Sequence, residues 1–173
     1  MTIKRRGTTS ALKRLAYAQL LILGFSLTHA IQAAPARSLM SGFNPLIGGQ
    51  WVLGSTYQTY TWGPDQQSVF GESFVIHNGE KALGAKGLWY FDPASKTIKG
   101  VFVATNMPFT VLHYRSHFEA GTLISQVRSL DNLGTENHYQ ETIRVTQPDA
   151  YLWELTEAEP AGNTMKAEFH RAP

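Results

Sequence analysis

The sequence predicts an all-β protein, an antiparallel up-and-down barrel of about ten strands. Three observations lead to this prediction. Apolar and polar residues alternate with period two in many short runs, as in strands that bury one face. Turn-forming residues separate these runs at intervals of about 8–12 residues, which is typical of barrels and sandwiches. No segment beyond the N-terminal leader keeps a helical period over about ten residues.

The C-terminal part of the chain shows this pattern most clearly. Residues 139–145, 151–155 and 165–169 each alternate apolar with polar side chains. Residues 147–149 (QPD) and 160–163 (PAGN) separate the three runs and have the composition of turns. We therefore expect the chain to end in an antiparallel meander of three strands.

Seven further strands are expected between this meander and the N-terminal segment. Asn78-Gly79 is the strongest hairpin signal among the turns that join them. The expected strands span residues 51–54, 57–62, 68–77, 81–91, 97–105, 109–118 and 122–130. The apolar rows expected to face inward include Phe70/Phe74/Ile76, Trp89/Phe91, Leu112/Tyr114/Phe118, Ile143/Val145, Tyr151/Trp153 and Met165/Phe169. Closing such a sheet removes its edges, so a barrel is favoured over the alternative, a two-sheet sandwich.

Residues 1–33 have the organisation of a secretory signal peptide. Basic residues run from Lys4 to Arg14, the apolar stretch Leu15–Leu27 follows, and small residues precede an expected cleavage after Ala33. The alternative is an uncleaved membrane anchor, although about 13 apolar residues are fewer than the roughly 20 that span a bilayer. Residues 34–48 are then a linker that leads into the barrel domain, residues 49–173, and the mature protein is periplasmic or secreted.

Charge and cysteine content exclude several functions. Five of the 15 basic residues lie in the leader, whereas all 13 acidic residues follow it, so residues 34–173 carry 10 basic and 13 acidic side chains, a net charge of −3. This balance argues against nucleic acid as a partner, because phosphate contacts need a basic face. The chain has no cysteine, which excludes disulfides, thiol nucleophiles and thiolate metal sites.

Several short motifs resemble a family of bacterial lipocalin-like domains of unknown function in the calycin superfamily of β-barrels. They are residues 43–51 (FNPLIGGQW), 139–142 (YQET), 148–153 (PDAYLW) and 165–171 (MKAEFHR), and the resemblance covers about residues 43–173. It implies a lipocalin-like barrel with an interior, and it implies no established activity.

The resemblance also implies a structural pair at one end of the barrel. In lipocalins a Gly-x-Trp near the first strand packs its indole beside an arginine from the last strand, and Trp51 and Arg171 occupy matching places here. Arg171 is in phase with Phe169, so it can lie over Trp51 as a cation–π lid. The alternative is a solvated Arg171 at the end of the chain.

Two carboxylates fall within apolar rows and are the candidate polar groups of the interior. Glu72 is in phase with Phe70 and Phe74, and Glu141 is in phase with Ile143. A carboxylate on a dry face is costly unless it is paired. Each could therefore orient a ligand or act as an acid or base; alternatively, each forms a structural pair or is turned outward by a bulge.

Aromatic residues complete the expected interior, which either holds a flat apolar ligand or is filled by its own side chains. The candidate ligand-binding residues are Glu72, Trp89, Tyr114, Tyr139, Glu141 and Trp153. No cofactor, metal site or catalytic residue is assigned, because catalytic signatures are absent from the sequence and His77, His113, His138 and His170 fall on the polar side of their strands.

The leading functional prediction is binding of a small, mostly apolar molecule in the barrel lumen. Two alternatives stay open: an enzyme (an isomerase, cyclase or hydrolase) that uses a lumen carboxylate, and a filled barrel that acts through its outer surface. A membrane is expected as a partner only through the leader, if the leader is not cleaved.

Overall fold

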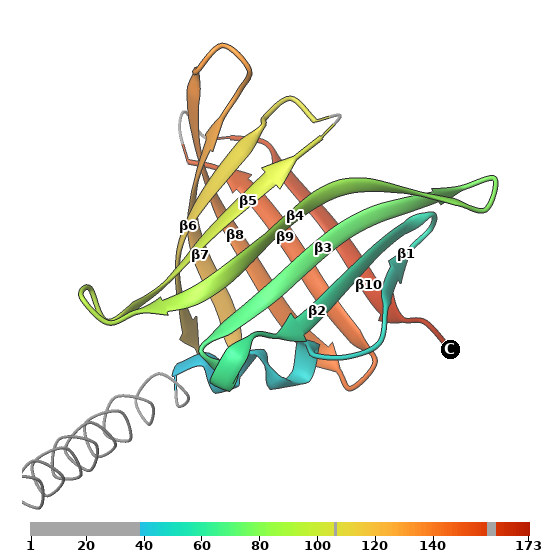
Figure 1. Cartoon of the computed structure of the whole chain (residues 1–173), viewed down its shortest axis with the longest axis horizontal. Helices are drawn as coiled ribbons and strands as arrows, with labels where there is room; N and C mark the ends of the chain where they lie inside the picture. Colours follow the sequence, from blue (N-terminus) through green and yellow to red (C-terminus); the bar gives the residue numbers. More distant parts are fainter. Residues whose placement is uncertain (1–38, 106, 159–161) are drawn as a thin grey trace, which may run out of the picture. The chain divides into compact units, whose positions relative to one another are not determined.

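The computed structural model describes residues 39–105, 107–158 and 162–173 (Figure 1). Ten antiparallel strands close into a single barrel in the order β1-β10-β9-β8-β7-β6-β5-β4-β3-β2, so each strand pairs with its neighbours in the chain and β1 pairs with β10. The strands are β1 (Trp51–Leu53), β2 (Thr56–Trp62), β3 (Ser68–His77), β4 (Glu80–Asp92), β5 (Thr97–Ala104), β6 (Val111–Glu119), β7 (Thr122–Leu130), β8 (Glu136–Gln147), β9 (Ala150–Glu157) and β10 (Thr164–Arg171).

The predicted fold class is confirmed, and the turn signals explain why. Asn78 and Gly79 join β3 to β4 and both have positive φ, 51° and 80°, the conformation that a two-residue hairpin of this type requires. A short 3₁₀-helix, η2 (Pro64–Gln66), connects β2 to β3. Among the described residues, no helix is long and apolar enough to cross a membrane.

A second 3₁₀-helix, η1 (Ser41–Leu46), lies across one end of the barrel (Figure 1). Its Phe43 side chain is completely buried and its Leu46 side chain is almost completely buried, and both belong to the main hydrophobic core. The Phe43 ring packs against Phe118 on β6 at a centroid distance of 5.0 Å and against Trp89 on β4 at 5.6 Å. This end of the barrel is therefore filled by side chains. The predicted signal peptide, residues 1–33, lies outside the described residues.

The inward row predicted for β3 is wrong at Phe70 and Ile76, each of which is 40% exposed. Val69 and Gly71 are buried instead. Phe74 is buried but lies outside the main hydrophobic core, where its ring stacks on Tyr57 of β2 at a centroid distance of 5.4 Å. Apolar residues occur on both faces of this strand, so the period-two pattern does not by itself identify the face that points inward.

Closure of the barrel depends on a short ladder between the first and last strands. Only Trp51–Arg171 and Val52–His170 pair β1 with β10. The Arg171 guanidinium lies 4.2 Å from the centroid of the fully buried Trp51 ring. It also donates hydrogen bonds to the backbone oxygens of Gly48 and Pro45, the latter at 2.7 Å. Arg171 thus ties the last strand to the segment that precedes the first.

Replacing Arg171 should measurably weaken the fold. We expect Arg171→Ala to lower the free energy of unfolding by about 2–3 kcal/mol, because it removes charged hydrogen bonds to backbone carbonyls and the cation–π contact. Urea titration measures this change. Arg144→Ala, at an exposed arginine on β8, is the matched control and should stay within about 0.5 kcal/mol of the parent. Equal effects of the two substitutions would contradict a closing role for Arg171.

Candidate functional site

A cavity of about 390 Å³ lies inside the barrel. Its wall includes residues from the barrel strands and the loop between β5 and β6, which lies at the opposite end from η1 (Figure 1). The lining residues are Gln58, Tyr60, Gly71, Glu72, Ser73, Ala85, Trp89, Phe102, Met107, Pro108, Phe109, Leu112, Tyr114, Glu141, Ile143, Trp153, Leu155 and Met165. The interior is therefore filled at the η1 end and hollow beyond it, with a size suited to a small molecule.

Aromatic rings form much of this wall. Trp89 on β4 packs against Phe102 on β5 at a centroid distance of 4.4 Å and against Tyr114 on β6 at 5.6 Å. Gly71 on β3 makes room for them, because a Cβ atom there would lie only 3.0 Å from both the Phe102 and Trp89 rings. Absence of a side chain at this position thus lets the two rings pack closely against β3.

Glu141 is the one buried carboxylate among the described residues, with 6% of its surface exposed. It points inward because it alternates in phase with buried Ile143 on β8. Its Oε1 accepts a hydrogen bond of 2.8 Å from the indole nitrogen of Trp153 on β9, while its Oε2 has no partner among the described residues. Burial raises the pKa of Glu141 to about 7, and the Trp153 hydrogen bond opposes part of that rise.

Three tyrosines interact electrostatically with the Glu141 carboxyl group. Tyr60 on β2 and Tyr151 on β9 donate to the side-chain oxygen of Gln58 at 2.6 and 2.5 Å, and their hydroxyls lie 3.3 Å apart. Burial raises the pKa of Tyr60, Tyr114 and Tyr151 well above the ordinary range, and the charge of Glu141 raises each further. The three phenols therefore stay neutral, and Glu141 is the group whose charge can change near neutral pH.

Glu72, the other predicted carboxylate, forms salt bridges with two lysines. It borders the cavity, but its two oxygens contact Lys86 at 2.7 Å and Lys81 at 3.0 Å, both exposed lysines of β4. The Lys86 and Lys81 hydrogen bonds lower the pKa of Glu72. Glu72 keeps phase with Phe70 as expected, but the expected inward direction of this row is wrong, since Phe70 is exposed and Glu72 lies directly opposite Lys86 in the ladder. Glu72 therefore forms a structural pair.

The other predicted site residues separate into two groups. Trp89, Tyr114 and Trp153 line the cavity together with Glu141. Tyr139 does not line this cavity, because it lies opposite Glu157 near the end of β9, beyond the ring of residues around Glu141.

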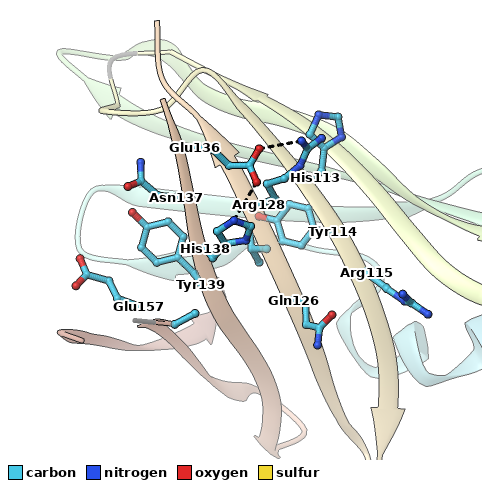
Figure 2. A pocket seen from close by; sticks show the side chains of 12 residues that line it. His113, Tyr114, Arg115, Gln126, Arg128, Glu136, Asn137, His138, Tyr139 and Glu157 are labelled. Atoms are coloured by element: carbon cyan, nitrogen blue, oxygen red, sulfur yellow. Dashed lines mark hydrogen bonds and ion pairs between the residues drawn. The ribbon is translucent and has the colours of Figure 1, made fainter. Parts of the chain in front are cut away.

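Tyr139 instead lines a second pocket of about 830 Å³ formed by β6, β7 and β8 and the end of β9. Figure 2 shows Glu136 between Arg128 and His138, which it contacts at 3.0 and 2.9 Å. His113 and Arg115 also line this pocket. Because Glu136 is paired with both Arg128 and His138 in this pocket, we assign it no ligand. Among the described residues, no group of three or more histidine, aspartate or glutamate side chains could hold a metal ion.

Sequence reasoning missed Gln58 and Tyr60 as parts of the interior. They lie two residues apart on β2, in phase with Trp62, so the period-two pattern contained the signal. The hydrogen bond from Tyr151 to Gln58 joins β9 to β2, strands that are far apart in the chain, and no local pattern indicates it.

No protein-family model matches the chain, and no curated protein matches it. The geometry therefore defines the class of protein: a closed, antiparallel ten-stranded barrel, compatible with a calycin-like fold, with a cavity beside a buried carboxyl group.

The raised pKa of Glu141 predicts a specific dependence of stability on pH. The folded protein holds the Glu141 proton up to about pH 7, whereas the unfolded chain releases it near the ordinary value of 4.5. Stability that comes from this group is thus present at low pH and is lost as the pH rises between these values.

We expect the free energy of unfolding to fall by about 3 kcal/mol relative to that of Glu141→Gln across this window, an order-of-magnitude value from the size of the shift. Urea titrations of both proteins at several pH values measure the difference. Glu168→Gln, at an exposed carboxylate of β10, is the control and should show no such trend. A constant difference between parent and Glu141→Gln would disprove the shift.

Proposed function

We propose that this protein binds a small, mostly apolar molecule inside its barrel. The single observation that carries the proposal is the cavity of about 390 Å³, whose wall is largely aromatic and aliphatic and contains one buried carboxyl group. Binding sites for small molecules commonly combine such walls with a few polar groups that fix orientation. A filled barrel that acts only through its outer surface would lack this space.

The wall of the cavity reaches exposed apolar side chains at the end opposite η1. Met107, in the loop after β5, and Met165, near the start of β10, line the cavity and are 41% and 51% exposed. Methionine side chains are flexible and adapt to ligands of different shape. They support access for an apolar ligand from this end.

Export and a lipocalin-like relationship belong to the same proposal. The basic, apolar and small-residue regions of residues 1–33 support a cleaved signal peptide and a periplasmic or secreted location. The motifs at residues 43–51 and 165–171 support a lipocalin-like member of the calycin superfamily. Sequencing the N-terminus of protein exported by its native host tests the first point, and a start at Ala34 is expected.

One observation favours a second candidate function, an enzyme that uses Glu141. A buried carboxyl group with a pKa of about 7 and one unpartnered oxygen can take or give a proton at neutral pH. Such a group suits an isomerase, cyclase or hydrolase. Conversion of the bound molecule by the parent protein, with loss of conversion in Glu141→Gln, would establish this alternative.

Filling the cavity should abolish binding without unfolding the barrel. The probe is 1-anilinonaphthalene-8-sulfonamide, an uncharged fluorophore whose emission rises in apolar surroundings, and mass spectrometry of the native protein detects any molecule that copurifies. We expect Ala85→Phe, which places a ring in the cavity, to lower probe affinity by about tenfold or more, since it occupies the ligand's space.

The matched control is Ala82→Phe, at an exposed alanine of the same strand, which should leave probe affinity unchanged. Circular dichroism verifies that both variants keep the sheet. Equal probe binding by the parent and by Ala85→Phe would refute a ligand site in the lumen.

A further inference from the structure

The side chains that line the cavity include acidic residues and no basic ones. Its two ionisable carboxyl groups are Glu141 and Glu72, and none of its lining residues is lysine, arginine or histidine. The two lysines nearest to Glu72 are exposed and hold that carboxylate. From this charge arrangement and the aromatic wall, we propose that the cavity selects a ligand with a protonated amine on a flat apolar body. The inference rests on the proposed ligand-binding function.

An anionic ligand is disfavoured by the same arrangement. A carboxylate or phosphate placed in the cavity would lose its water and meet no cationic side chain, a costly combination. It would also lie in the field of Glu141. Arg171 is already engaged with Trp51 and with backbone oxygens at the η1 end.

A cationic ligand receives two kinds of stabilisation. Glu141 can pair with an ammonium group through its unpartnered Oε2, because Trp153 occupies only Oε1. The Trp153 hydrogen bond also fixes the position of the carboxylate before the ligand arrives, which lowers the cost of binding. The rings of Trp89 and Tyr114 line the same cavity and attract cations through their π faces.

The tyrosines that interact with Glu141 are neutral, so the charge of Glu141 decides which ligands the cavity selects. Tyr60 from β2, Tyr114 from β6 and Tyr151 from β9 interact with it electrostatically, and burial keeps all three phenols neutral. Its pKa of about 7 means that the carboxyl group ionises readily when a cation binds beside it. An amine should therefore bind more tightly as Glu141 loses its proton.

A matched series of ligands tests this inference: 4-phenylbutylamine, 4-phenyl-1-butanol and 4-phenylbutyrate, which share ring and chain and differ in charge. Isothermal titration calorimetry at about pH 8 should show the amine binding about tenfold or more tightly than the alcohol, since it alone pairs with a buried carboxylate. The butyrate should bind most weakly. The Glu141→Gln substitution should remove the advantage of the amine and leave affinity for the alcohol within about threefold.

Two further measurements separate this inference from a general change in the protein. Lowering the pH to about 5.5 should weaken amine binding to the parent several-fold by protonating Glu141, and should leave amine binding to Glu141→Gln unchanged. Glu168→Gln, on the outer face of β10, is the control and should retain the amine preference at about pH 8.

The outcomes distinguish the inference from the function on which it rests. Equal or tighter binding of the butyrate, or equal loss of all three ligands in Glu141→Gln, would overturn the amine class while leaving lumen binding in place. Failure of the parent to bind any of the three, together with no difference between the parent and Ala85→Phe in fluorophore binding, would overturn the lumen site itself.

Discussion

The contact of Arg171 with Trp51 and with the segment before β1 is the interaction on which closure of the barrel depends. β1 is a strand of three residues and pairs with β10 at only two positions. A ladder this short supplies few hydrogen bonds to oppose the entropy of bringing the two ends of the sheet together. Arg171 adds bonds that reach past the ladder to Pro45 and Gly48, so the end of the chain also fixes η1 over the barrel.

Fixing η1 divides the interior into a packed part and a hollow part. Phe43 and Leu46 fill the space beside Trp51, and the indole nitrogen of Trp51 donates to the Leu46 oxygen at 2.9 Å. Beyond this region the rings of Trp89 and Phe102 contact each other, pack over Gly71 and line the cavity. The packed end supplies core stability, and the remaining volume is left available to a ligand.

The two carboxylates show how environment decides the role of one residue type. Glu72 lies opposite Lys86 near the outer surface, where solvent screens the pair and its contribution to stability is small. Glu141 lies in the interior with a single neutral hydrogen-bond donor, so its ionised form destabilises the folded protein. A buried carboxyl group that lowers the stability of the folded protein and borders a cavity is the arrangement expected of a group that pairs with a ligand.

The sequence by itself determined the all-β class, the strands and their turns, because alternation and turn chemistry are local properties. It also placed Trp89, Tyr114, Glu141 and Trp153 on inward faces, since each keeps phase with buried neighbours. Tertiary structure decided what no local pattern contains. Closure of the barrel placed Phe70 on the outer face of β3, two lysines contact Glu72, and Tyr139 lies outside the cavity. Whether a side chain finds a partner depends on residues distant in the chain, so only the closed barrel distinguished a paired carboxylate from an unpaired one.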